Sequence, residues 1–217
     1  MFRLYLVTDR TLVADLPRAI DRALSGVPRG GAAVQLREKD LGARALLDLA
    51  RAVAAPCRRH GAPLIVNDRL DVAVAAGADG VHLAGGSVDV ADARRLLPRG
   101  LVGASWHEGA LRAGVDFAVF SPVFPSPGKG PAVGLDALAR ACTAGVPLLA
   151  LGGVDTANAS ACAAAGAHGV AAIRAWLGAD DPAEACAALH AAVLRGSAER
   201  FSQGGIEPPM TRPRSVC

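Results

Sequence analysis

The stretch LIVNDRLDVAVAAGADGVHL, residues 64–83, holds two short apolar runs separated by one helical segment. The runs are Leu64–Asn67 and Gly80–Leu83, and neither alternates apolar with polar residues, which is typical of parallel strands buried on both faces. The segment between them is rich in alanine, and the glycine at its end suits a helix C-cap followed by a tight turn. The stretch therefore predicts one strand–helix–strand unit of an α/β fold.

The same pattern recurs along the chain and predicts eight strands. They are Arg3–Thr8, Ala33–Leu36, Leu64–Asn67, Gly80–Leu83, Leu101–Ala104, Phe117–Phe120, Leu148–Leu151 and Gly169–Ile173. Helical periodicity is clear between several of them, for example over residues 43–55 and 183–194, whereas residues 108–113 allow only a very short helix. Eight such units favour a single (β/α)8 TIM barrel, and a doubly wound open sheet is the alternative.

The character of the sequence changes at Gly196. Residues 196–217 contain one Gly-Gly pair and one Pro-Pro pair and show little apolar periodicity. We therefore expect a barrel domain over residues 1–195 and a disordered C-terminal tail over residues 196–217.

Composition excludes several classes of protein. The 217 residues include 23 basic and 20 acidic side chains, and only 4% are aromatic, which argues against a nucleic-acid partner. The uncharged stretch over residues 141–154 is interrupted by glycine and proline and is shorter than the roughly 20 residues of a membrane span. The N-terminal residues lack the pattern of a signal peptide, so we expect none, and five scattered cysteines indicate reduced thiols. These features predict a cytoplasmic protein without a membrane segment.

Unusual polar residues gather where the predicted strands end, which is where functional groups lie in such barrels. Only two of the 23 basic residues are lysine, Lys39 and Lys129, and both fall at strand ends, as does Arg37. Three cations close together repel one another, and an anionic ligand such as a diphosphate offsets that cost. The alternative is a solvated basic rim paired with the acids Glu38, Asp40 and Asp68.

Further strand ends carry candidate groups. Gly152-Gly153 and the loop after the eighth strand predict a second phosphate site, because glycine lets backbone amides approach an anion. Asp68 beside a polyanion suits a bridging Mg²⁺, and a helix cap is the alternative. His82 and His107 are candidates for proton transfer, although a hydrogen-bonded structural role is the commoner one for such residues.

The chain resembles the thiamine-phosphate synthase/TenI family over residues 3–194. The matching runs are YLVTDR (5–10), VQLREKD (34–40), LIVNDRLDVAVAAGADGVHL (64–83), VGASWH (102–107), SPVFPSPGK (121–129), LALGGV (149–154) and GVAAIRAWLGADDP (169–182). The resemblance implies a (β/α)8 barrel, often a homodimer, acting on small phosphorylated substrates. In such a synthase, hydroxymethylpyrimidine diphosphate and thiazole phosphate give thiamine phosphate and pyrophosphate with Mg²⁺. TenI relatives instead aromatise a thiazole carboxylate phosphate by proton transfer.

The resemblance also implies roles for single residues. The pyrimidine diphosphate would contact Gln35, Arg37, Lys39, Asn67, Ser105 and Lys129. Of these, the three cations would be catalytic, because they stabilise charge on the departing pyrophosphate. The thiazole phosphate would contact Ser126, Gly153, Ile173 and Arg174, and Mg²⁺ would bind Asp68.

Three departures from the family pattern bear on the activity. Ser87 stands where the synthase pattern HLGQxD has a second metal-binding aspartate, which predicts a weakened Mg²⁺ site. The loop pattern PTxTK reads PSPGK here, and Arg174 replaces a serine. Pro122 occupies the position at which some TenI enzymes have a histidine that transfers protons. Three functions therefore stay open: a synthase, a TenI-like tautomerase, and a non-catalytic barrel that binds thiamine intermediates.

Overall fold

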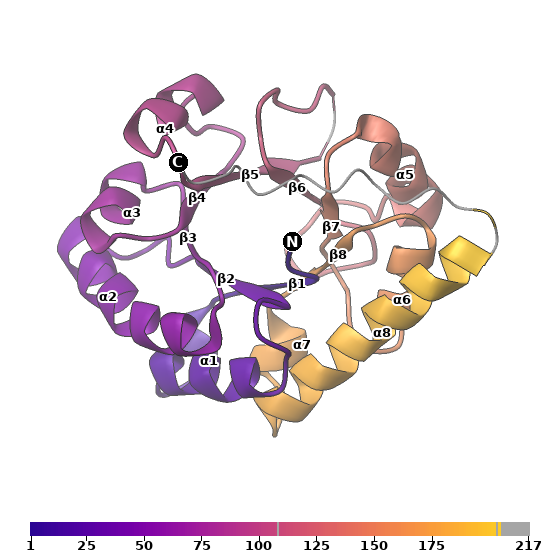
Figure 1. Ribbon diagram of the computed structural model, residues 1–217, viewed down its shortest axis with the longest axis horizontal. Coiled ribbons are helices and arrows are strands. Elements are labelled where there is room, and N and C mark those ends of the chain that lie inside the picture. Colours follow the sequence, from indigo (N-terminus) through magenta and orange to yellow (C-terminus); the bar gives the residue numbers. More distant parts are fainter. Residues whose placement is uncertain (108, 203, 205–217) are drawn as a thin grey trace.

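The computed structural model describes residues 1–107, 109–202 and 204, and its strands form one closed barrel (Figure 1). The eight strands are parallel and follow one another in sequence order, and β8 returns to pair with β1. They are β1 (Leu4–Val7), β2 (Ala32–Leu36), β3 (Leu64–Asn67), β4 (Gly80–Leu83), β5 (Leu101–Trp106), β6 (Phe117–Phe120), β7 (Leu148–Ala150) and β8 (Gly169–Ala172). This closure confirms the predicted (β/α)8 barrel and excludes the open sheet, which would leave two edge strands unpaired.

Helices surround the strands (Figure 1). The α-helices are α1 (Leu16–Ser25), α2 (Ala43–His60), α3 (Leu70–Ala76), α4 (Val90–Leu96), α5 (Gly134–Ala141), α6 (Ala159–Ala164), α7 (Arg174–Leu177) and α8 (Pro182–Ser202). Two short 3-10 helices, η1 (Arg10–Leu12) and η2 (Cys142–Ala144), complete the set. None of the helices in the described ranges is long and apolar enough to cross a membrane.

The connection from β5 to β6 lacks the short helix expected at residues 108–113. Residue 107 and residues 109–116 form only bends, turns and irregular structure, and residue 108 lies outside the described part. Gly109 and Gly114 have φ angles of 74° and 82°, in the left-handed region that interrupts a right-handed helix. The Arg112 guanidinium instead ties the segment to the carbonyl oxygens of Gly85 and Val88, at 2.8 and 3.1 Å.

The last helix is longer than the sequence predicted. Helix α8 continues to Ser202, so the expected tail does not begin at Gly196, which is buried within the helix. A Cβ at this position would overlap the carbonyl oxygen of Ser160, so only glycine permits this close contact between α8 and α6. Residues 203 and 205–217 of the predicted tail lie outside the described residues.

Side chains alternate along each strand between the barrel interior and the helices. Tyr5 lies in the inner cluster with Ile65 and Phe117, whereas Leu4 and Leu6 belong to the cluster that packs under the helices. This alternation gives the barrel a solid apolar interior, as expected for eight strands.

Four cysteines, Cys57, Cys142, Cys162 and Cys186, have free thiols. This agrees with the prediction of reduced cysteines, and Cys217 lies outside the described residues. Burial raises the pKa of Cys57, Cys162 and Cys186 to about 12, so these thiols are unreactive packing groups at neutral pH.

Candidate active site

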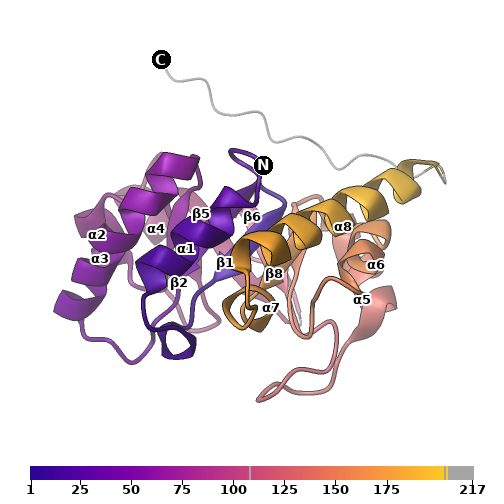
Figure 2. The same ribbon diagram turned by 90° about the horizontal axis from the view of Figure 1, so that it is seen from below.

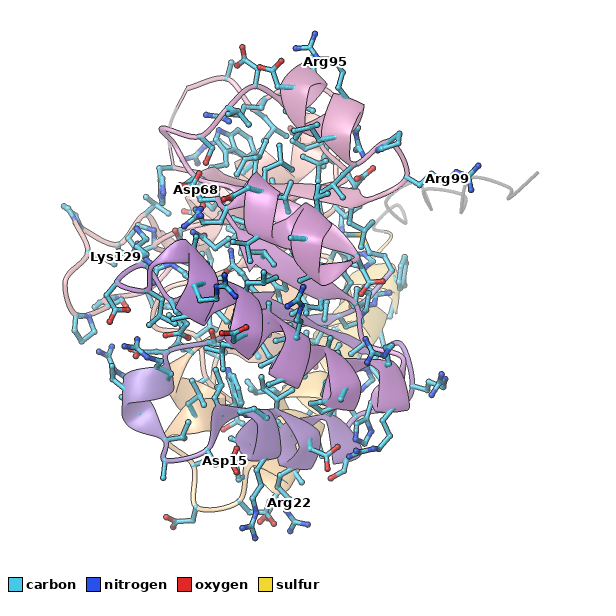
Figure 3. The ribbon with its side chains drawn as sticks, turned by 90° about the vertical axis from the view of Figure 1, so that its left-hand side faces the viewer. Asp15, Arg22, Asp68, Arg95, Arg99 and Lys129 are labelled. Atoms are coloured by element: carbon cyan, nitrogen blue, oxygen red, sulfur yellow. The ribbon has the colours of Figure 1, made fainter. Side chains whose placement is uncertain are left out.

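The predicted site residues all lie at or just beyond the carboxyl ends of strands, which form one end of the barrel, here called the mouth. They are Gln35, Arg37, Lys39, Asn67, Asp68, Ser105, Ser126, Lys129, Gly153, Ile173 and Arg174. Figure 2 shows the loop between β6 and α5 projecting beyond the barrel at one end, while the N-terminus lies at the other. Figure 3 shows Asp68 and Lys129 towards one side of the molecule, with Arg99 on the opposite side.

Two amides meet at the ends of β2 and β3. The Gln35 Nε2 donates a hydrogen bond of 3.2 Å to the Asn67 Oδ1, and Gln35 is buried whereas Asn67 is half-buried. Within the described residues, the side-chain oxygen Oε1 of Gln35 and the side-chain nitrogen Nδ2 of Asn67 make no hydrogen bond. A donor and an acceptor are therefore available side by side to a polar heterocycle.

Deeper in the barrel, His82 links Tyr5 to Ser105. The Tyr5 hydroxyl lies 3.4 Å from His82 Nδ1, and His82 Nε2 lies 3.0 Å from Ser105 Oγ. Burial, helped by the nearby Arg37 guanidinium, lowers the pKa of His82 to about 3, so the ring is neutral. A neutral ring that accepts from Tyr5 at Nδ1 donates from Nε2 to Ser105. The Ser105 proton is then free to be donated to a ligand.

A second network joins the ends of β1 and β2. The buried Thr8 Oγ1 donates to Glu38 Oε1 at 2.5 Å and accepts from the Arg37 amide at 2.9 Å. The Arg10 amide donates to both Glu38 oxygens, at 3.2 and 3.1 Å. The Arg10 guanidinium donates two hydrogen bonds to the Asp40 carboxylate, of 2.8 and 2.7 Å, and one of 3.4 Å to Glu38.

The three proposed catalytic cations are free of counter-ions. Arg37 is half-buried while Lys39 and Lys129 are exposed, and none forms an ion pair with the rest of the described chain. The acids that a solvated rim would need are engaged elsewhere, by Arg10 and by Ser87. The structure therefore contradicts the alternative of an internally paired rim.

Asp68 follows β3 in a left-handed conformation, with a φ of 63°, and is exposed. The Ser87 hydroxyl donates to its carboxylate and accepts from the Ala84 amide at 2.7 Å. The N-cap of α3 is Arg69, without a side-chain cap, so the Asp68 carboxylate does not cap that helix. In the described ranges, no three His, Cys, Asp or Glu side chains gather as a metal site. Asp68 and Ser87 thus offer one carboxylate and one hydroxyl, with a single negative charge between them.

The loops after β6 and β7 run together. The Phe124 amide donates to the Gly152 carbonyl at 3.0 Å, and Asn158 Nδ2 donates to the Gly153 carbonyl at 2.8 Å. Gly153 has a φ of 62°, and a Cβ there would lie 2.5 Å from the Pro125 carbonyl oxygen. Glycine is therefore required for this loop to pass so close to its neighbour.

The remaining predicted phosphate contacts border these loops. Ser126 is half-buried, and its carbonyl accepts from the Lys129 amide at 3.2 Å, so a turn joins the two residues. Ile173 is the N-cap of the short helix α7, and Arg174, its first residue, is exposed. These groups come from separate strand ends, and no hydrogen bond joins their side chains in the described part of the chain.

Sequence reasoning missed Tyr5, Thr8 and Arg10 as parts of this site. A signal was present, because alternation along Arg37-Glu38-Lys39 places Glu38 on the side opposite to the two cations. A buried carboxylate there requires donors, and YLVTDR ends in a threonine, an aspartate and an arginine.

A family model described as thiamine monophosphate synthase matches residues 4–176. The chain belongs to this family. A relative from Geobacter sulfurreducens is 47% identical over 87% of this chain and 92% of its own length. The thiamine-phosphate synthase of Roseiflexus sp. strain RS-1 is 40% identical, covering 92% of this chain and 89% of its own. The solved thiamine phosphate pyrophosphorylase from Pyrococcus furiosus superimposes with a TM-score of 0.81 at 30% identity, covering 90% and 96%.

In this member of the thiamine monophosphate synthase family, two of the positions considered for the proton transfer of a tautomerase are poorly suited to it. His82 is buried between Tyr5 and Ser105, and its lowered pKa keeps the ring neutral at neutral pH, so it does not act as an imidazolium acid. Pro122 occupies the position before Val123-Phe124 where some relatives of that kind carry a histidine.

Proposed function

We propose that the barrel condenses hydroxymethylpyrimidine diphosphate with thiazole phosphate to form thiamine phosphate and pyrophosphate. The observation that carries the proposal is the set of three cations, at the mouth of a barrel of this family, that have no counter-ion among the described residues. Cations held near one another favour a polyanionic substrate, and a diphosphate that departs as pyrophosphate is one.

The reaction needs no protein nucleophile. The thiazole nitrogen lone pair forms the new C–N bond, and the electron pair of the breaking C–O bond leaves with pyrophosphate. Gln35 Oε1 and Asn67 Nδ2 bind and orient the pyrimidine, and the Ser105 hydroxyl donates a hydrogen bond to it. Arg37, Lys39 and Lys129 stabilise the negative charge that develops on the leaving group.

The second substrate lies across the mouth. The thiazole phosphate binds Ser126, the loop at Gly153, and the backbone at Ile173 and Arg174, where the first amides of α7 have no partner within the helix. The exposed Arg174 adds a cation where the family pattern has a serine. Binding both substrates at one mouth supplies proximity.

The residues present fit Mg²⁺ in combination with a substrate. Asp68 and Ser87 would hold it, since Mg²⁺ accepts oxygen ligands and retains several waters. When bound, Mg²⁺ supplies positive charge to the diphosphate. A homodimer and a cytoplasmic location, both predicted from the sequence, complete the proposal.

Incubating the protein with both substrates and Mg²⁺ tests the proposal, with thiamine phosphate and pyrophosphate as the measured products. Lys39→Ala and Lys129→Ala should each lower kcat/KM by about 100-fold or more, because each removes a positive charge that stabilises the departing pyrophosphate. Arg99→Ala, at the opposite end of the barrel, is the matched control and should leave turnover unchanged. Substrate binding without product would instead identify a non-catalytic barrel.

A further inference from the structure

Two acids flank Lys39 in the segment that follows β2. Glu38 precedes it and Asp40 follows it, within a turn closed by a hydrogen bond of 3.4 Å from the Leu41 amide to the Glu38 carbonyl. An acid adjacent to a cation in sequence is a potential counter-ion, and Asp40 follows Lys39 directly. If either acid paired with Lys39 or Arg37, that pair would have to break before a phosphate could bind.

Arg10 engages both acids from a different strand end. Its guanidinium forms the two-bond contact with Asp40 and reaches Glu38, and the hydrogen bonds to Arg10 lower the pKa of Asp40. The Glu38 side chain is only 2% exposed. A guanidinium matches this task, because its planar donors can serve two carboxylates at once.

We propose that Arg10 is a positioning residue of the diphosphate site: its guanidinium holds Asp40, and so keeps Lys39 free for the ligand. The inference rests on the proposed function and deepens it, because it assigns the charge balance of that site to a residue outside it. In this role Arg10 acts through Asp40 and not on the reacting groups.

The two acids respond differently to loss of the Arg10 side chain. Glu38 keeps the Thr8 hydroxyl and the Arg10 main-chain amide, so it stays in place. Asp40 is exposed and loses both of the hydrogen bonds that its carboxylate accepts from the Arg10 guanidinium. Asp40 is therefore the acid that becomes free to compete with a phosphate for Lys39.

The experiment measures the Kd of pyrophosphate at fixed Mg²⁺ by calorimetry. Arg10→Met keeps the side-chain stem without the charge, and it should raise Kd about fivefold, the size expected when one exposed ion pair competes with the ligand. Adding Asp40→Asn should return Kd to within twofold of the wild type, and Asp40→Asn alone should change little. With the two substrates, Arg10→Met should raise KM for the pyrimidine diphosphate and leave kcat within twofold.

Arg22→Met is the matched control, because Arg22 forms a similar two-bond pair with Asp181 elsewhere in the fold. If Arg10→Met does not fold, Arg10→Lys decides, since one ammonium pairs with one acid and should give a smaller rise that Asp40→Asn removes. An unchanged Kd, or a double variant as weak as the single one, overturns the inference while wild-type turnover leaves the proposed function intact. A wild type that does not bind pyrophosphate overturns both.

Discussion

At the residue scale, the contact between Ser87 and Asp68 determines how strongly the mouth attracts a divalent cation. Ser87→Asp should lower the Mg²⁺ concentration needed for half-maximal turnover, because a carboxylate replaces a neutral hydroxyl beside Asp68. Asp68→Asn should raise that concentration. Turnover measured against Mg²⁺ concentration in the two variants checks both expectations.

The same pair gives a control that does not depend on turnover. Without Mg²⁺, Ser87→Asp should lower the melting temperature, since two adjacent carboxylates repel, and Mg²⁺ should restore it. Ser87→Ala leaves the charge unchanged and should show no such metal dependence. If neither Ser87→Asp nor Asp68→Asn alters the Mg²⁺ requirement, the metal binds elsewhere.

His82 makes the stability of the fold depend on pH. The pKa of His82 falls to about 3 in the folded protein, below the ordinary histidine value of 6.5. As the pH drops below 6.5, the unfolded chain therefore takes up a proton at this ring before the folded protein does. The stabilisation from the neutral ring is complete above about pH 6.5 and is lost as pH falls towards 3, reaching a loss of about 2 kcal/mol by pH 5. His82→Gln should therefore lose less unfolding free energy between pH 7 and pH 5, as measured by urea denaturation.

His168 contributes in the same direction. Burial lowers its pKa to about 4, so a double variant with His82→Gln and His168→Gln should have the smallest pH dependence. Equal slopes for wild type and His82→Gln would show that the His82 ring is not held neutral inside the barrel.

Sequence reasoning identified residues of the mouth better than their partners. Lys39 and Lys129 could be placed at strand ends because parallel strands put all carboxyl ends on one side. Local alternation does not single out Thr8 as the partner of Glu38, since Thr8 lies 30 positions away and meets it through the pairing of β1 with β2. Alternation gives the side on which a residue lies, but tertiary structure decides what it touches there.

At the element scale, Gly196 controls the contact between α8 and α6. Helix propensity alone predicts that Gly196→Ala stabilises the protein by about 1 kcal/mol. The contact with the Ser160 carbonyl reverses the sign, and we expect a loss of about 1–3 kcal/mol of unfolding free energy, measured by denaturation.

A variant at an exposed position of the same helix calibrates this result. Ala198→Gly should cost about 1 kcal/mol through propensity alone. A rise in stability with Gly196→Ala would mean that α8 moves away from α6 without cost.

The boundaries that sequence reasoning missed both involve glycine. The change of composition at Gly196 predicts the end of the folded domain, yet Gly196 lies on the buried side of α8 with Leu189 and Val193. Gly109 and Gly114, in contrast, adopt left-handed angles and prevent a helix between β5 and β6. A glycine can allow close packing or interrupt a helix, and the sequence alone does not distinguish these two effects.

At the scale of the whole molecule, the barrel interior depends on a missing side chain. A Cβ at Gly103 in β5 would overlap the ring of Phe117 in β6, which also packs against Phe2 and Tyr5. Gly103→Ala should lower the unfolding free energy by about 1–3 kcal/mol, measured by denaturation.

Gly130 provides the comparison, because a Cβ there meets nothing within 4 Å. Gly130→Ala should change the unfolding free energy by less than about 0.5 kcal/mol. If both variants were equally stable, the Phe117 ring would have room to shift inside the barrel.

The barrel cannot close during synthesis until β8 has been made, because β8 pairs with β1. Tyr5 pairs with Ala171, and the Trp176 indole donates to the carbonyl oxygens of both Val7 and Ala172 across this junction. A ribosome that adds about 5–20 residues per second leaves β1 waiting for its second neighbour for roughly 10–30 seconds. During that interval one edge of β1 is exposed to other nascent chains, so expression yield should depend on chaperones that protect unfinished chains.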